Sequence, residues 1–276
     1  MSCRCDSKLN LSLFIYEKTT NFDKVMLGGT MQYKQVERVD PALDATRADD
    51  PFRDDRLLAE MQDIVTGEST FGIRLVDTPE GRSKASMLIH KMYAWRGLEG
   101  THALSDDPNR VTLMAHNREE AVGTLTLGLD SPSGILADQL FRAEIDAFRA
   151  RGKRVCEFIK LAFDMGPKSK SYLAALIHLA VMYAYDIHRF DVLFIEVTPR
   201  HRQFYQRMLG FRQLGEEVVN PRVNVRGVLM HIELSYMKEQ IRRFGGQPDS
   251  DERSFYPLFF SPHEEAGIIN RLRQQE

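Results

Sequence analysis

The stretch that decides the fold is VCEFIKLAFD, residues 155–164, which is apolar enough to form a strand inside a sheet. It nevertheless contains a glutamate, Glu157, and a lysine, Lys160. Because successive side chains of a strand point to opposite faces, Leu161 is expected on the face of Glu157, and Ala162 on the face of Lys160. The two charges therefore cannot pair with each other, and each must serve different surroundings.

The segments around this strand alternate between strand and helix patterns. We expect further strands at 71–77, 110–116, 122–130, 192–197, 210–218 and 228–234, and helices at 79–95, 135–150, 168–188 and 200–209. A hairpin and strand–helix–strand steps occur together, which predicts an α/β fold with a mixed central sheet flanked by helices. Ligands of such sheets bind at the carboxyl ends of the strands, where neighbouring strands diverge.

The chain of 276 residues is long enough for one domain with an arm. Residues 1–66 lack sustained periodicity, so we expect an N-terminal arm that is partly disordered. Residues 67–245 are expected to form the folded domain, and residues 246–276 an extension that packs on it.

Composition excludes several classes of protein. A net charge of −2 argues against binding to nucleic acid, and no run of about 18 apolar residues predicts a membrane helix. Two of the three cysteines crowd the N-terminus, which favours a reducing cytoplasm over a disulfide framework. The eight histidines do not occur at ligand spacing, so we expect no metal.

The segment TPRHRQFYQRMLGF, residues 198–211, ends a strand, forms a short helix and turns into the next strand. It resembles the closing segment of the GNAT superfamily of acyltransferases, in which the tyrosine matching Tyr205 often protonates the leaving thiolate. The resemblance implies a GNAT fold and an acid role for Tyr205. The alternative is that Tyr205 is only an aromatic at the edge of the core.

The loop after the central strand, DMGPKSKSYLAAL, differs from coenzyme-A-dependent members of that superfamily. Those members hold the pyrophosphate with a glycine-rich loop, whereas here only Gly166 is present and Pro167 has no amide hydrogen to donate. Lys168 and Lys170 are instead placed to meet the phosphate of a phosphopantetheine arm, or the acidic surface of an acyl carrier protein.

Two further resemblances narrow the class. EFIKLAFD, residues 157–164, is similar to the E-x-S-R-F-A-x-D motif of acyl-homoserine lactone synthases, with Lys160 where arginine is usual. Over residues 71–267 the chain more closely resembles the long-chain N-acyl amino acid synthases of the N-acyl tyrosine type. The matching segments are FGIRLVDTPEGRSKASMLIHKMYAWRG, GTLTLGLDSPSGILADQLF, RVCEFIKLAFD, VTPRHRQFYQRMLGF, NPRVN and SFYPLFFSPHEEAG.

This resemblance implies transfer of a fatty acyl group from acyl carrier protein to the α-amine of an amino acid, with no bound cofactor. Glu157 would accept the proton of the incoming ammonium. The alternative is that Glu157 is a structural ion-pair partner of an arginine. A backbone amide within residues 158–163, near a bulge, would bind the oxyanion. A nucleophilic role for Cys156 is disfavoured because no histidine is placed beside it by the sequence.

The substrates each need a binding surface. An arginine should hold the amino acid carboxylate, and the resemblance favours Arg96 beside Trp95, with Arg200 as a further candidate. Arg154, in the basic run 142–154, is expected to join Lys168 and Lys170 in a cationic edge that binds the acidic carrier protein. Phe163 is expected to contact the phosphopantetheine. The basic run also fits a solvated helix face, and a lipid product implies proximity to a membrane surface.

Two other functions stay open. A homoserine-lactone-type signal synthase would need S-adenosylmethionine as the amine donor, and the motif departures argue against it. A non-catalytic module that binds acyl carrier protein or lipid would keep full function after Glu157→Ala. An acetyl-CoA-dependent acetyltransferase is disfavoured by the degenerate phosphate loop.

Overall fold

The structure is a computed structural model that describes residues 71–95, 97–98, 102–104, 106–117, 120–164 and 169–273. The expectations for the arm at residues 1–66, and for Arg96 and Lys168, lie outside these ranges. In the described part of the chain, no helix is long and apolar enough to cross a membrane.

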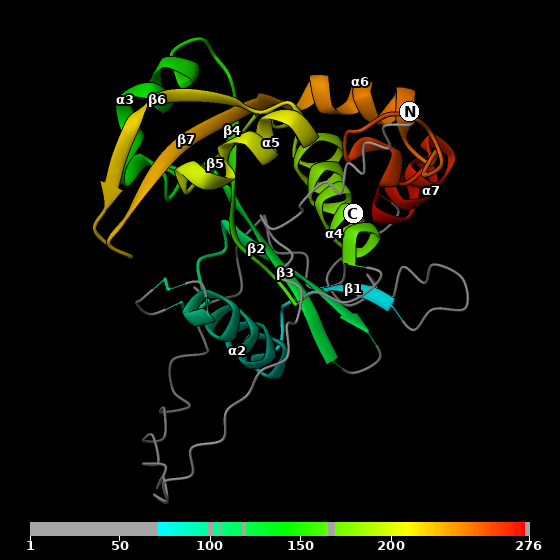
Figure 1. Cartoon of the computed structure of the whole chain (residues 1–276), viewed down its shortest axis with the longest axis horizontal. Coiled ribbons are helices and arrows are strands. Elements are labelled where there is room, and N and C mark those ends of the chain that lie inside the picture. Colours follow the sequence, from blue (N-terminus) through cyan, green and yellow to red (C-terminus); the bar gives the residue numbers. More distant parts are fainter. Residues whose placement is uncertain are drawn as a thin grey trace, which may run out of the picture.

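Seven strands and the helices between them form one mixed sheet with helical layers (Figure 1). The strands are β1 (Phe71–Leu75), β2 (Arg110–Asn117), β3 (Glu120–Leu129), β4 (Val155–Phe163), β5 (Val192–Val197), β6 (Arg212–Asn220) and β7 (Val225–Glu233). The helices are α2 (Pro79–Trp95), α3 (Asp138–Arg149), α4 (Ser169–Val181), α5 (Arg202–Leu209), α6 (Leu234–Phe244) and α7 (Pro262–Arg273), and a π-helical turn, Met182–Ile187, continues α4.

The sheet has the order β1-β2-β3-β4-β5-β7-β6. β4 and β5 are parallel, and the other neighbouring strands are antiparallel. The pairing of β4 with β5 ends at Phe158 and Ile195, although both strands continue beyond these residues. The predicted mixed α/β sheet is therefore confirmed, and the divergence of its strands lies between β4 and β5.

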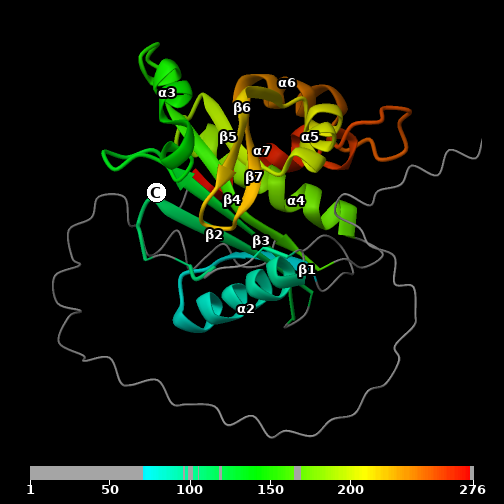
Figure 2. The same ribbon diagram turned by 60° about the vertical axis from the view of Figure 1, so that its left-hand side comes forward.

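Helices cover both faces of the sheet. α3 packs Phe141, Ile145 and Phe148 against one face of β4, β5 and β7. α4 is buried against the other face, in the main core. α2 contacts β3 and β4, and it lies across the β1–β3 part of the sheet from α4 (Figure 2).

The C-terminal residues complete the layer around α4. The buried ring of His178 in α4 makes a hydrogen bond through Nε2 to Glu265 Oε1 of α7, at 2.9 Å. Nδ1 of the same ring accepts a hydrogen bond from the backbone N–H of Phe260. The Tyr256 hydroxyl donates to the carbonyl oxygen of Leu209, at the end of α5. These contacts tie the last residues of the described chain to the two helices that flank the β4–β5 opening.

Candidate active site

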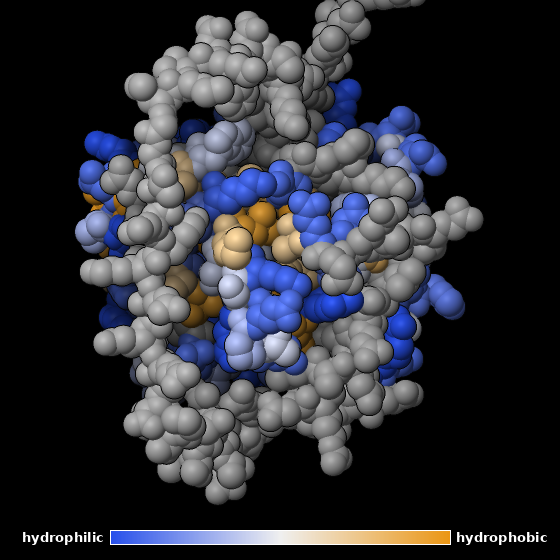
Figure 3. All heavy atoms as spheres, turned by 90° about the horizontal axis from the view of Figure 1, so that it is seen from below, coloured by the Kyte–Doolittle hydropathy of each residue, from blue (hydrophilic) through white to orange (hydrophobic). Residues whose placement is uncertain are grey.

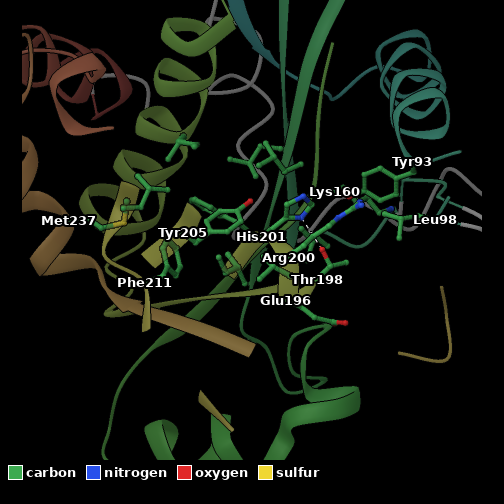
Figure 4. A pocket seen from close by; sticks show the side chains of 18 residues that line it. Tyr93, Leu98, Lys160, Glu196, Thr198, Arg200, His201, Tyr205, Phe211 and Met237 are labelled. Carbon is green, nitrogen blue, oxygen red and sulfur yellow. Dashed lines mark hydrogen bonds between the residues drawn. The ribbon is translucent and has the colours of Figure 1, made fainter. Parts of the chain in front are cut away.

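Two adjoining cavities occupy the space where β4 and β5 separate. One has a volume of about 150 Å³ and the other about 480 Å³. Figure 4 shows Tyr205 and Phe211 on one side of the smaller cavity, Tyr93 and Leu98 on the other, and Lys160 between them. The cavities share the wall formed by Tyr93, Leu98, Phe158, Ile159, Lys160, Glu196, Val197 and Thr198. They lie at the carboxyl ends of the two strands, where the sequence pattern placed the ligand site.

The smaller cavity is mainly apolar. Its lining includes Leu125, Leu161, Ile177, Ile195, Leu209, Phe211 and Met237. Tyr205 is buried in α5, and its hydroxyl points toward the side of the cavity on which Lys160 lies (Figure 4). α5 ends at Gly210, whose φ of 85° suits glycine, and the chain then enters β6. A tyrosine and an apolar wall thus face the end of β4.

A β-bulge lies in β4 at the cavity. Thr126 pairs with Ile159 and Thr124 pairs with Ala162, so Lys160 and Leu161 both stand opposite a single residue of β3. Lys160 has a φ of 52°, a left-handed conformation that is uncommon for lysine. The bulge lies inside the predicted range 158–163, and a bulge leaves its extra residue unpaired in the ladder. The role of its backbone amide as oxyanion donor stays a prediction.

Because of the bulge, the predicted assignment of β4 side chains to the two faces of the sheet is wrong beyond Lys160. Ala162 packs with α2, in the cluster of Leu88, Ile89 and Met92, while Phe163 packs in the main core with α4. Because one extra residue reverses the alternation of side chains, residues beyond the bulge no longer face the sides that simple alternation predicts.

The Lys160 side chain reaches across the opening. Its ammonium donates a hydrogen bond to the carbonyl oxygen of Ala103, in the connection between α2 and β2. It lines both cavities and is half-buried. Burial is the main cause that lowers the pKa of Lys160, and the nearby Arg110 cation lowers it further.

Glu157 lies in a closed environment. Its Oε1 accepts hydrogen bonds from Arg110 Nη1 at 3.2 Å and from the backbone N–H of Leu136 at 2.6 Å. Its Oε2 accepts from the backbone N–H of Ala137 at 2.9 Å. Burial raises the pKa of Glu157, and the bonds from Leu136, Ala137 and Arg110 oppose that rise.

This placement differs from the one expected from the resemblance. Glu157 lines neither cavity; its carboxylate instead holds the backbone amides just before α3, which have no partner within the helix. The geometry favours the structural alternative, an ion pair with Arg110, over a proton-accepting role. Cys156, its neighbour, is fully buried, and burial raises the pKa of its thiol, which disfavours a nucleophile.

The predicted amino-acid-binding residues are only partly brought together. Arg200 lines the smaller cavity. Trp95 is 60% exposed and lines neither cavity, whereas Tyr93 of the same helix lines both. Tyr93 is a site residue that the sequence reasoning missed, although it lies two positions before the residue that was chosen.

The predicted carrier-binding residues lie at different places. Arg154 precedes β4, about 20 Å from the bulge at ~3.3 Å per residue, and its guanidinium stacks over Phe190. Phe163 is 1% exposed and lines neither cavity, so its expected contact with phosphopantetheine stays a prediction that the geometry does not support. Lys170 is exposed in the first turn of α4, at the carboxyl end of β4. The predicted single cationic edge is therefore wrong, because Arg154 and Lys170 lie at opposite ends of β4.

A second network missed by the sequence reasoning borders the larger cavity. Glu196 at the end of β5 accepts hydrogen bonds from Asn220 Nδ2 at 2.5 Å and from Arg222 Nη2 at 3.1 Å. A Cβ atom on Gly227, in β7, would lie 2.7 Å from Glu196 Oε1, so a larger residue there would force the glutamate side chain to shift. The NPRVN segment, residues 220–224, was the signal for this network.

Both hydrophobic and hydrophilic side chains reach the surface on the face seen from below (Figure 3). Seen from below (Figure 3), hydrophobic side chains reach the surface in small areas between hydrophilic ones. Among the described residues, no group of three or more His, Cys, Asp or Glu side chains could hold a metal ion.

The mixed sheet whose strands separate between β4 and β5 is the GNAT-type fold that the sequence predicted. Residues 84–233, more than half of the chain, match the family N-acyl amino acid synthase FeeM, and the chain belongs to this family. It is accordingly an acyltransferase of N-acyl amino acid synthesis. A search of curated proteins finds no match.

Several solved structures are similar to the chain, and FeeM supports the fold. The chain is similar to FeeM, an N-acyl amino acid synthase from uncultured soil microbes, with 24% identity and a TM-score of 0.57 over 63% of this chain and 96% of that chain. It is also similar to the AHL synthase LasI, with 13% identity and a TM-score of 0.42 over 60% of this chain and 91% of that one. An N-acetyltransferase from Staphylococcus aureus Mu50 matches at 12% identity and a TM-score of 0.41, over 60% and 98% of the two chains.

Proposed function

We propose that the chain transfers a long-chain acyl group from the phosphopantetheine thioester of acyl carrier protein to the α-amine of an amino acid. The observation that carries this proposal is the β4–β5 opening, which combines a bulged strand, an apolar cavity and the buried Tyr205. The reaction needs these three elements: a donor for the oxyanion, a wall for the acyl group and an acid for the leaving thiolate.

The proposed step balances without a covalent enzyme intermediate. The neutral α-amine attacks the thioester carbonyl carbon, a C–N bond forms and the C–S bond breaks. The backbone at Lys160 and Leu161 stabilises the developing oxyanion. Tyr205 donates a proton to the departing thiolate. The proton that the amine loses when the C–N bond forms then returns to Tyr205. Glu157 has no part in this step, because its carboxylate lies outside both cavities.

The carrier-protein donor is supported by the sequence before α4. This segment has a single glycine, Gly166, and Pro167 lacks an amide hydrogen, which makes it a poor site for the pyrophosphate of coenzyme A. Lys170 provides an exposed positive charge at the same end of β4 as the cavities, and it suits an acidic partner. We place the reaction in a bacterial cytoplasm, since the cysteine usage suits a reducing compartment.

Mass spectrometry of organic extracts tests this function. Cells that express the wild-type chain should contain N-acyl amino acids absent from empty-vector cells, and Tyr205→Phe should lower kcat of the purified protein about 100-fold. The same assay with acyl carrier protein and coenzyme A thioesters should give a higher kcat/KM for the carrier protein. Folded wild-type protein that yields no N-acyl amino acid with either donor contradicts the proposal.

A further inference from the structure

The positive charges around the larger cavity are not equivalent. The arginines that line it each form an ion pair: Arg110 with Glu157 and Asp107, Arg222 with Glu196, and Arg226 with Glu217. Lys160 lines the same cavity and forms no ion pair with any residue that the structure describes. Its ammonium is satisfied in part by one neutral acceptor, the carbonyl oxygen of Ala103.

A half-buried ammonium without an anion is costly, since burial removes water from the charge. Arg110 lies close enough to Lys160 to lower its pKa further, and the carboxylate of Glu157 is occupied by Arg110 and two backbone amides. The larger cavity therefore contains one cation that no described carboxylate neutralises. An anionic group of a ligand would remove this imbalance.

The backbone at Lys160 adds a second, independent reason. Lys160 adopts a φ of 52° in the bulge, and non-glycine residues in this region are often found at ligand sites. Thr124 Oγ1 donates a hydrogen bond to the carbonyl oxygen of Lys160 at 3.0 Å, which holds the bulge in place. The side chain and the proposed oxyanion donor thus belong to the same short segment.

We propose that Lys160 binds the α-carboxylate of the amino acid substrate in the larger cavity. This inference rests on the proposed function and names the residue that recognises the substrate class. The α-carboxylate is separated from the attacking nitrogen by a single carbon atom. An amine that attacks a carbonyl group bound at the bulge therefore carries its carboxylate next to the Lys160 ammonium.

The other cations fit this role less well. Arg222 is already held by Glu196 and Asn220, so its guanidinium is largely neutralised. Arg200 lines the smaller, apolar cavity and is exposed, so water already solvates its charge. Lys160 alone combines burial, a wall position in the larger cavity and the absence of a described carboxylate partner.

The test compares an amino acid with the amine that lacks its carboxylate. The preferred amino acid is first identified with the purified wild-type chain, and initial rates are then measured for it and for its decarboxylated amine at saturating donor. Lys160→Met should raise KM for the amino acid about 10- to 100-fold, and it should lower kcat/KM for the amino acid far more than kcat/KM for the amine. Lys160→Arg should restore most of the preference, since it keeps the charge. Lys84→Met, which removes a partly exposed lysine of α2 outside both cavities, is the matched control.

The possible outcomes distinguish the inference about Lys160 from the proposed function. Collapse of the preference for the carboxylate in Lys160→Met, with the melting temperature retained, supports the inference. An unchanged preference overturns it while leaving the proposed function intact. A rise in KM for the acyl donor instead assigns the cation to the phosphate of phosphopantetheine and also overturns it. Wild-type protein that acylates neither substrate contradicts the proposed function, and the inference with it. If Lys160→Met does not fold, the Lys160→Arg variant decides, since a carboxylate site tolerates it with a modest rise in KM.

Discussion

Glu157 and Lys160 lie three residues apart on β4, and their surroundings are opposite. The carboxylate of Glu157 is 2% exposed and accepts bonds from Arg110 and two backbone amides, which fills the space around it. The ammonium of Lys160 lines two cavities and meets a single carbonyl oxygen among the described residues. One charge therefore stabilises the fold, and the other is available to a ligand.

The bulge explains the difference. Before it, β4 is paired on both sides and its side chains are buried against α3 and α4. At Lys160 and Leu161 the partner β5 has already separated, and the ladder to β3 is interrupted. A titratable residue in the paired half must be satisfied by protein groups, whereas one at the bulge can be satisfied by substrate.

The largest effect is expected from removing the Glu157 carboxylate. Glu157→Ala should lower the free energy of unfolding by about 3 kcal/mol, because it leaves Arg110 and two backbone amides without their acceptor. Chemical denaturation with an unchanged m-value measures this loss. A double-mutant cycle with Arg110→Ala should show coupling between the two residues. Normal stability combined with complete loss of activity would return Glu157 to the catalytic role.

A smaller loss of stability should follow from crowding the same carboxylate. A Cβ atom on Gly128, the partner of Glu157 in β3, would lie 2.7 Å from Glu157 Cγ and 2.8 Å from Oε1. Gly128→Ala should therefore displace the side chain and cost about 1–3 kcal/mol. Gly267→Ala, where a Cβ meets nothing within 4 Å, serves as the control in the same melts. Equal melting temperatures for both variants would show that Glu157 has room to move.

The smallest change in stability is expected at Lys160, where the substitution should leave stability unchanged or raise it slightly. Lys160→Gly relieves the left-handed backbone, whose cost for an L-residue is roughly 1–2 kcal/mol, but also removes the half-buried side chain. Thermal denaturation should show an unchanged or slightly higher midpoint, while the preference for the amino acid over its amine is lost. A clear drop in the midpoint would mean that Lys160 is a structural residue like Glu157.

Local patterns predicted most of the architecture. The spacing of apolar residues in α2 indicated its buried face, and Ala85, Leu88, Ile89 and Met92 are all buried. The β2–β3 hairpin and the parallel β4–β5 pair followed from strand patterns and the intervening helix. α6 was missed although Leu234, Met237 and Ile241 have helical spacing, because the segment directly continues a strand.

The site was less predictable because it depends on residues distant in sequence. No glycine or proline marks the bulge at Lys160, so simple alternation was assumed through it. The partners of Glu157 come from β2 and from the start of α3, which no local pattern connects to β4. Arg154 and Lys170 were predicted to form one cationic edge because they lie on either side of the same segment of sequence. That segment is β4, a nine-residue strand, which separates them in space.

The most direct test of the account is one assay on Glu157→Gln and Lys160→Met, with turnover expressed per folded protein. We predict that Glu157→Gln melts at a lower temperature but keeps its preference for the amino acid over the decarboxylated amine. Lys160→Met should keep its melting temperature and lose that preference. The reverse pattern, a stable but inactive Glu157→Gln beside a Lys160→Met with normal preference, would contradict the assignment of structure to the glutamate and recognition to the lysine.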